Sequence, residues 1–179
     1  AVIKKVIDIA SLLNAVSVVA HPVQGRGEVV LNEESFYNLV KAFNILDLYA
    51  KEKKTTIAVE NLIDNPVHFI TTALLDKLPT LNLCFDAGHA AISNTLDLYL
   101  PKYINRVIAL HIHDNDLKTD DHRFPEDGLV NFNTLFSILL KNNYKGVFGF
   151  ETVQKKSKAK GNYTELANRV YNFLDKMVR

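Results

Sequence analysis

The chain has 179 residues, 47% of them apolar and 23% charged, which is the composition of a globular protein with one domain over residues 1–179. Its formal net charge of +1 argues against bulk attraction to nucleic acid or anionic membrane, and it contains no run of about 18 apolar residues that would predict a membrane span. The single cysteine, Cys84, excludes an internal disulfide framework, and the first residues lack a signal-peptide cleavage site, so we expect a cytoplasmic protein.

Short apolar runs alternate with longer amphipathic segments along the chain. In chain order we expect helix 3–14, strand 17–20, helix 33–53, strand 56–59, helix 65–77, strand 81–85, helix 95–103, strand 107–112, helix 133–142, strand 147–150 and helix 162–178. The strands are apolar almost throughout, which is typical of parallel strands covered on both faces. The alternation therefore predicts an α/β fold with a parallel sheet.

Capping residues support several of these helices. Asn32 precedes the helix 33–53, and Asn65-Pro66 predicts the start of the helix 65–77, within which we expect His68 to be structural. Asn162 and Glu165 have the spacing of a capping box at the start of the last helix.

Each predicted strand ends at or beside a residue that can bind a metal ion or a proton. In chain order these residues are His21, Glu60, Asp86 with His89, His111 with His113 and Asp116, and Glu151. In an α/β barrel the carboxyl ends of the strands converge on one mouth, where the active site is built. Carboxylates crowded there would repel one another, and a divalent cation such as Mn²⁺, Mg²⁺ or Zn²⁺ would relieve that repulsion.

Each residue also has a structural interpretation. Asp86 or Glu60 could cap the helix that follows its strand, and His21, which precedes a proline, could belong to a turn. We expect one of His111 and His113 to point into the barrel and the other outward, and we favour His113 as the ligand.

The ordered series VVAHP, VEN, FDAGHA, HIHDND, DDHRFPEDG and GFE, between Val16 and Thr152, resembles the xylose-isomerase-like barrel superfamily. That group includes sugar-phosphate isomerases and epimerases and the endonuclease IV type of apurinic-site nuclease. The resemblance implies a parallel (β/α) TIM-type barrel. Such a barrel takes at least ~200 residues, so we expect this chain to lack its first one or two βα units. An open barrel edge would favour self-association into a homo-oligomer. The alternative fold is an open doubly wound sheet, although no glycine-rich phosphate loop follows the first strand.

In the isomerase and epimerase branch, the resemblance implies one divalent metal ion held by Glu60, Asp86, His113 and Glu151. It also implies that Glu60 and Glu151 act as the acid–base pair and that His89 binds a substrate hydroxyl. The function expected from this branch is isomerisation or epimerisation of a small sugar or sugar phosphate through an enediolate, with Mn²⁺, Mg²⁺ or Zn²⁺ as cofactor.

In the nuclease branch, the resemblance implies three zinc ions, with His21, His89, Asp120 and His122 as further ligands. We favour the sugar branch, in which these four residues bind substrate or orient ligands. The motifs resemble the sugar isomerases more closely, and the net charge of +1 offers little grip on DNA. A third possibility is a non-catalytic, metal-binding remnant of the same fold.

Two polar loops have alternative interpretations. The loop TDDHRFPEDG (119–128), which contains Asp120 and His122, is either a solvated turn or part of the site. We expect the basic run KKSKAKG (155–161) to be a solvated loop, and its alternative is contact with a phosphate on a sugar or on DNA.

Overall fold

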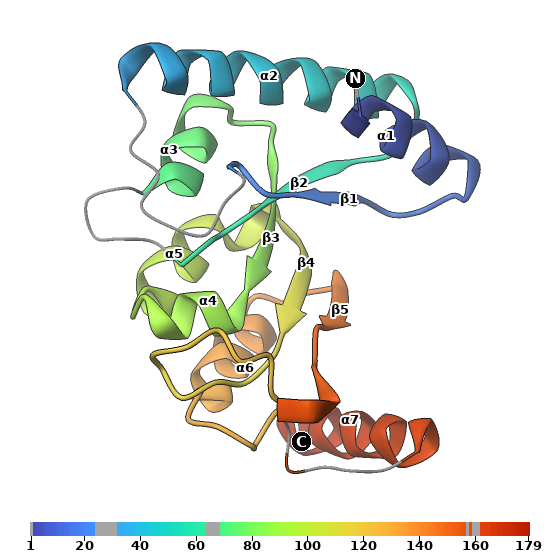
Figure 1. Cartoon of the computed structure of the whole chain (residues 1–179), viewed down its shortest axis with the longest axis vertical. Helices are drawn as coiled ribbons and strands as arrows, with labels where there is room; N and C mark the ends of the chain where they lie inside the picture. Colours follow the sequence, from blue (N-terminus) through green and yellow to red (C-terminus); the bar gives the residue numbers. More distant parts are fainter. Residues whose placement is uncertain (1, 24–31, 64–68, 157, 159–161) are drawn as a thin grey trace. The chain divides into compact units, whose positions relative to one another are not determined.

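The computed structural model describes residues 2–23, 32–63, 69–156, 158 and 162–179 (Figure 1). Five strands form one sheet in the order β1-β2-β3-β4-β5, and helices lie between them in the chain. This confirms the predicted parallel α/β fold of the TIM-barrel type. The chain divides into two compact units: unit 1 comprises Ala1–Cys84 and Arg106–Ala109, and unit 2 comprises Phe85–Asn105 and Leu110–Arg179.

The helices and strands that begin in unit 1 are α1 (Val2–Leu12), β1 (Val18–Ala20), α2 (Glu33–Glu52), β2 (Ile57–Glu60), α3 (Ile70–Lys77) and β3 (Asn82–Asp86). β1 pairs with β2 and β2 with β3, both in parallel, and the second register sets Glu60 opposite Cys84. Small side chains, Ala58, Cys84 and Ala109, form a buried cluster within the unit.

The helices of unit 1 agree closely with the prediction. Asn32 caps α2 by accepting a hydrogen bond from the Ser35 backbone N–H at 2.8 Å. The Tyr49 hydroxyl on α2 donates to Asp8 on α1 at 2.6 Å. Asn65-Pro66 and His68, which concern the predicted start of the third helix, lie outside the described residues.

Arg106 donates hydrogen bonds to backbone carbonyl groups at the end of α3. Its guanidinium donates to the backbone oxygens of Leu75 at 2.8 Å and of Leu78 at 2.6 Å, and its Nε donates to Leu81 at 2.8 Å. These three carbonyls lie in the last turn of the helix and the loop after it, where no helical N–H is available to them. One planar cation therefore joins α3 to the start of β4.

We expect Arg106→Lys to lower the free energy of unfolding by roughly 1–3 kcal/mol, because an ammonium group cannot reproduce the fork of donors. Urea denaturation measures this change. Lys41→Ala, which alters an exposed side chain on α2, serves as the control and should change stability by less than about 0.5 kcal/mol. Equal stability of the Arg106→Lys protein and the wild type would contradict the assignment.

The remaining elements are α4 (Ala87–Ile92), α5 (Leu96–Tyr103), η1 (Ile104–Arg106), β4 (Val107–Ile112), α6 (Phe132–Lys141), β5 (Val147–Phe150), η2 (Gln154–Lys156) and α7 (Tyr163–Val178). The capping box of Asn162 and Glu165 is present at the start of α7. Phe173 of α7 packs edge-on against Phe132 and Phe136 of α6, with ring centroids 5.1 Å and 5.7 Å apart. Among the described residues, no helix combines the length and apolar character needed to cross a membrane.

No residue range was predicted for helix α4, although Asp86 was considered as a helix cap. Its six residues, Ala87–Ile92, are too few to show a periodic apolar pattern. The helix exists because Asp86, the last residue of β3, caps it, and this places α4 directly beside the candidate site.

Candidate metal centre

Asp86 is fully buried at the carboxyl end of β3 and has two roles. Its Oδ1 accepts a hydrogen bond from the backbone N–H of His89 at 2.6 Å, which caps α4. The same oxygen lies 3.1 Å from Nε2 of His113. Burial alone would raise the pKa of Asp86, but the hydrogen bond from His113 and the charges of His89 and His113 outweigh it and lower that pKa. The capping interpretation is therefore correct, and it does not exclude a role as a ligand.

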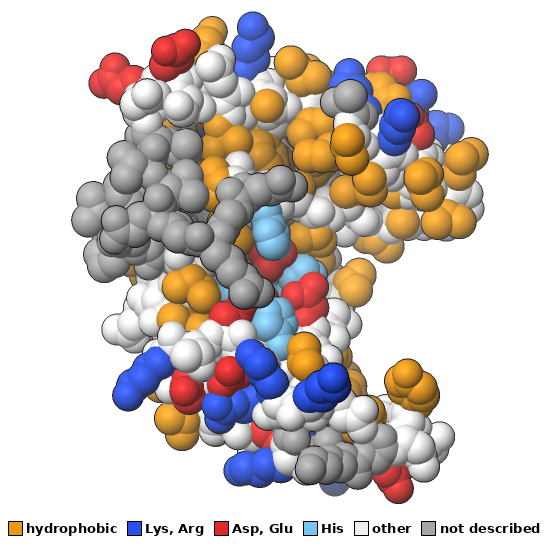
Figure 2. Space-filling model, viewed as in Figure 1, with side chains coloured by type: hydrophobic (Ala, Val, Ile, Leu, Met, Phe, Trp, Pro, Cys, Tyr) orange, Lys and Arg blue, Asp and Glu red, His pale blue; other side chains and the backbone are white. Residues whose placement is uncertain are grey.

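Unit 2 brings its candidate ligands together in two groups. The carboxylate group comprises Asp86, His111 and Glu151, and the histidine group comprises His89, His113, Asp120 and His122. Within each group, one donor atom per residue lies within 4.8 Å of the others. Figure 2 shows histidine and acidic atoms side by side on one face of the molecule.

His111 and His113 both approach Asp86. His111 Nδ1 is 4.0 Å from Asp86 Oδ2 and 3.5 Å from Glu151 Oε1, while His113 contacts the other Asp86 oxygen. The expectation that one imidazole points inward and the other outward is wrong, because residues two apart along an extended chain face the same side. Asp86 thus lies between the two groups, with one oxygen toward each.

The backbone orients His122. Its Nδ1 donates to the Glu151 carbonyl at 2.8 Å, since a carbonyl oxygen can only accept, and this leaves Nε2 facing Asp120 at 3.2 Å. An imidazole whose Nδ1–H is held by a carbonyl is the usual arrangement of a metal ligand that binds through Nε2. The ring also stacks on His113, with centroids 4.0 Å apart. His122 has φ 51°, a backbone conformation that side chains rarely adopt outside functional sites and turns.

Asp120 and His122 form the charged pair of the histidine group. Burial opposes ionisation of Asp120, but hydrogen bonds with His122 and His89 hold its pKa well below its usual range. The hydrogen bond with Asp120 raises the pKa of His122 to about 9, against the effect of burial. His113 Nδ1, in contrast, is buried and has no hydrogen-bond partner among the residues that the structure describes.

Unit 1 contains the remaining two candidates, His21 and Glu60. His21 Nε2 lies 3.2 Å from Glu60 Oε2, and the Glu60 side chain is 3% exposed against 53% for His21. Glu60 does not cap α3, since Phe69 occupies that position without a side-chain hydrogen bond. The register of β2 on β3 sets Glu60 opposite Cys84, two residues before Asp86.

Both groups have the chemistry of divalent-cation sites. Asp86, His111 and Glu151 offer two carboxylates and one imidazole, which suits Mn²⁺, Mg²⁺ or Zn²⁺. The histidine group offers three imidazoles and one carboxylate, and these donors favour Zn²⁺. The residues present therefore fit a metal ion, as expected from the strand ends.

Gly88 shapes the candidate site, although glycine has no side chain that could bind a metal ion or a proton. It lies between Asp86 and His89 in the motif FDAGHA. A Cβ atom at this position would lie 2.0 Å from Cε1 and 2.4 Å from Nε2 of His113. Only glycine leaves space for that ring. A glycine next to a predicted ligand at a strand end was the available signal.

Gly88→Ala should displace the His113 imidazole, lower stability by roughly 1–3 kcal/mol through overpacking, and weaken Co²⁺ binding about tenfold or more. Titration with Co²⁺ and urea denaturation measure the two effects. The control is Lys141→Ala, which alters an exposed side chain of α6 and should change neither measurement. If both alanine variants bind Co²⁺ as the wild type does, the packing of Gly88 against His113 has no bearing on the site.

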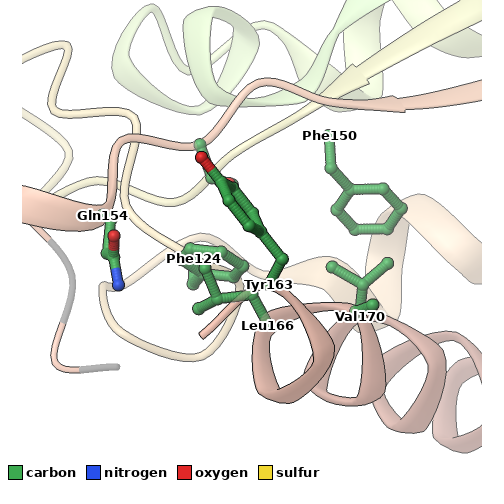
Figure 3. A pocket seen from close by; sticks show the side chains of 8 residues that line it. Phe124, Phe150, Gln154, Tyr163, Leu166 and Val170 are labelled. Carbon is green, nitrogen blue, oxygen red and sulfur yellow. The ribbon is translucent and has the colours of Figure 1, made fainter. Parts of the chain in front are cut away.

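A cavity of about 550 Å³ lies elsewhere in unit 2, between the end of β5 and the start of α7 (Figure 3). It is lined by Phe124, Phe150, Thr152, Gln154, Tyr163, Leu166, Ala167 and Val170. None of the candidate ligands lines it. Its walls are mostly apolar, with Thr152, Gln154 and Tyr163 as the polar residues.

Comparison with known proteins identifies the fold family. The family described as Xylose isomerase-like TIM barrel matches residues 1–176. An inosose dehydratase of Clostridium perfringens is 32% identical over 170 residues, which cover 78% of this chain and 57% of the dehydratase. The chain spans about three fifths of the length of the curated relatives it matches.

Solved structures agree on the fold. The D-allulose 3-epimerase of Methylomonas sp. in complex with D-allulose superposes with a TM-score of 0.79 at 20% identity, covering 97% of this chain and 67% of the epimerase. An L-ribulose 3-epimerase superposes with a TM-score of 0.81 at 16% identity, covering 98% of this chain and 65% of that protein. At these identities the likeness shows the fold alone.

Proposed function

The chain belongs to the xylose isomerase-like TIM-barrel family, and we propose that it acts as a divalent-metal-dependent isomerase or epimerase of a small sugar or sugar phosphate. The observation that carries this proposal is the carboxylate group, in which donor atoms of Asp86, His111 and Glu151 lie within 4.8 Å of one another at the ends of neighbouring strands. Active sites of barrel enzymes lie at the strand ends, and carboxylates and imidazoles there are suited to metal-assisted chemistry.

The proposed ligands of the ion are Asp86, His111 and Glu151, with Glu60 as a third carboxylate. Glu60 is included because it is a buried carboxylate at the end of β2 and because the family resemblance assigns it to the same ion. The family resemblance assigns the imidazole to His113, whereas the donor distances favour His111 for this group. The bound ion would polarise the substrate carbonyl and an adjacent hydroxyl.

The two glutamates are proposed to move the proton. Glu151 has an accessible side chain, 44% exposed, and would remove the proton from the carbon beside the carbonyl. Glu60, buried beside His21, would return a proton to that carbon. In this proposal His21, His89, Asp120 and His122 bind substrate hydroxyls or orient the ligands.

Removal of a proton beside a carbonyl can begin more than one kind of reaction. A ketose 3-epimerase and an inosose dehydratase, as named, can each begin by removing a proton beside a carbonyl, and they differ in the second step. Return of the proton to the opposite face gives an epimer, whereas loss of a hydroxyl from the next carbon gives a dehydrated product. We favour return of the proton, because Glu60 supplies a second carboxyl group for that step.

The test is exchange of substrate carbon-bound protons in deuterated water across a panel of ketoses, ketose phosphates and inososes, with Mn²⁺, Mg²⁺ or Zn²⁺ supplied. We expect metal-dependent deuterium incorporation with at least one substrate class. Metal binding without any exchange would refute the enzymatic proposal and support a non-catalytic, metal-binding role. Loss of water from the substrate would instead indicate that the enzyme is a dehydratase and not an epimerase.

Paired variants decide which imidazole serves the carboxylate group. We expect His111→Ala to weaken Mn²⁺ binding more than His113→Ala does. The reverse order would return the ligand role to His113, as the family resemblance implies.

The histidine group supports a second candidate function, an endonuclease IV-like zinc nuclease acting at abasic sites. Its four donors lie next to the carboxylate group through the His113–Asp86 contact of 3.1 Å, and nucleases of this kind need clustered ions. Elemental analysis combined with an incision assay on abasic duplex DNA decides between the two functions. Two or three zinc ions per chain with strand cleavage would favour the nuclease, and one ion without cleavage would exclude it.

A further inference from the structure

Asp114 is a buried carboxylate that belongs to neither group of candidate ligands. It follows His113 directly, and its side chain and that of Asn115 are at most 1% exposed. Asp114 Oδ1 accepts from the backbone N–H groups of Asn115 at 2.8 Å and Val130 at 3.0 Å, and Oδ2 accepts from Gly128 at 2.9 Å. A buried negative charge is tolerated here because three backbone donors satisfy it.

The backbone of Asp114 also contacts the loop 114–130, to which Gly128 and Val130 belong. Asp114 and Arg123 form an isolated antiparallel bridge, with both N–H···O distances 2.8 Å. The residues on either side of this bridge are His113 and His122, whose rings stack at 4.0 Å. Asp114 therefore contacts the loop that carries Asp120 and His122 at Arg123 through its backbone and at Gly128 and Val130 through its carboxylate.

The neighbouring residues leave little freedom at this point. The Asn115 side chain donates to the Gly88 carbonyl at 3.0 Å, which ties the network to α4 and the His113 ring. A Cβ atom on Gly128 would lie 2.4 Å from Asp114 Oδ1 and 2.2 Å from the Asn115 carbonyl. The loop thus closes onto Asp114 through a position where only glycine fits.

We propose that Asp114 is a positioning residue that holds His122 and Asp120 of the loop 114–130 against His113 and so maintains the geometry of the histidine group. The part of this inference that concerns ion binding at the histidine group rests on the proposed function. The contacts between Asp114 and the loop are made by protein atoms alone and can be tested separately from ion binding.

The test is Asp114→Asn, which keeps the shape of the side chain but replaces one acceptor oxygen by a donor NH₂ group that must face a backbone N–H. We expect three results: amide exchange at Gly128 and Val130 accelerates about tenfold or more, the His113 and His122 ring-proton resonances lose the shifts caused by stacking, and Co²⁺ binding at the histidine group weakens about tenfold. The matched control is Asp47→Asn, another buried carboxylate, which accepts from Lys51 and Thr80 and touches no candidate ligand. It should change none of the three readouts.

Unchanged exchange or unchanged ring resonances in Asp114→Asn would overturn the inference, and so would faster exchange with the rings still stacked. If Asp114→Asn does not fold, Gly128→Ala disturbs the same carboxylate from the loop side and is judged by the same readouts. Absence of Co²⁺ binding by the wild type at the histidine group would refute an ion there, while exchange and ring shifts still decide the role of Asp114.

Discussion

Replacing Glu151 with glutamine is expected to lower the rate of the proposed reaction about 10²–10⁴-fold. The free energy of unfolding should stay close to that of the wild type. Glutamine has the same shape but can neither accept the substrate proton nor contribute a negative charge to an ion. The Glu151 side chain is 44% exposed and lies outside the core. The Glu151 backbone accepts a hydrogen bond from His122 and donates one to the Ile112 carbonyl, and neither bond depends on the side chain.

Proton exchange in deuterated water measures the first effect, and the midpoint of urea denaturation measures the second. Glu126→Gln is a suitable control, because Glu126 is a similarly exposed glutamate of unit 2 that pairs with Lys176. An equally active Glu151→Gln protein would remove Glu151 from the mechanism.

The second large effect is expected from Asp86→Asn, which separates the two roles of this residue. Asparagine caps helices as well as aspartate does, so its side-chain oxygen can still accept from the His89 N–H and α4 should remain folded. The negative charge between the two groups is lost, and with it a carboxylate oxygen directed toward each of them. We expect divalent-ion binding to fall more than about 100-fold and stability to fall by no more than about 1–2 kcal/mol.

Asp86→Ala is the companion variant. It removes the cap as well as the charge, so it should lose about 1 kcal/mol more stability than Asp86→Asn while binding metal equally poorly. Calorimetric titration with Mn²⁺ and Zn²⁺, together with urea denaturation, measures both quantities. Ion binding by Asp86→Asn at wild-type strength would reduce Asp86 to its capping role.

Local sequence patterns were sufficient for most of the secondary structure. The predicted strands 107–112 and 147–150 coincide with β4 and β5, because apolar runs bounded by polar residues need no tertiary information to be recognised. The capping box at Asn162 was also visible, since its two hydrogen bonds join residues three positions apart. The range of helix α4 was missed, although Asp86 was considered as a cap, because six residues are too few to show a periodic pattern.

The family and the kinds of candidate ligand were accessible from the sequence by itself, because the motifs at the strand ends occur in a fixed order and carry the donor atoms that metals prefer. The division of those ligands into a carboxylate group and a histidine group was decided only by the tertiary structure. The tertiary structure also revealed the space that Gly88 leaves for His113 and the hydrogen bond that Asp114 accepts from Gly128. Such arrangements depend on distances between atoms of different strands and loops, and these distances are set by packing rather than by spacing along the chain.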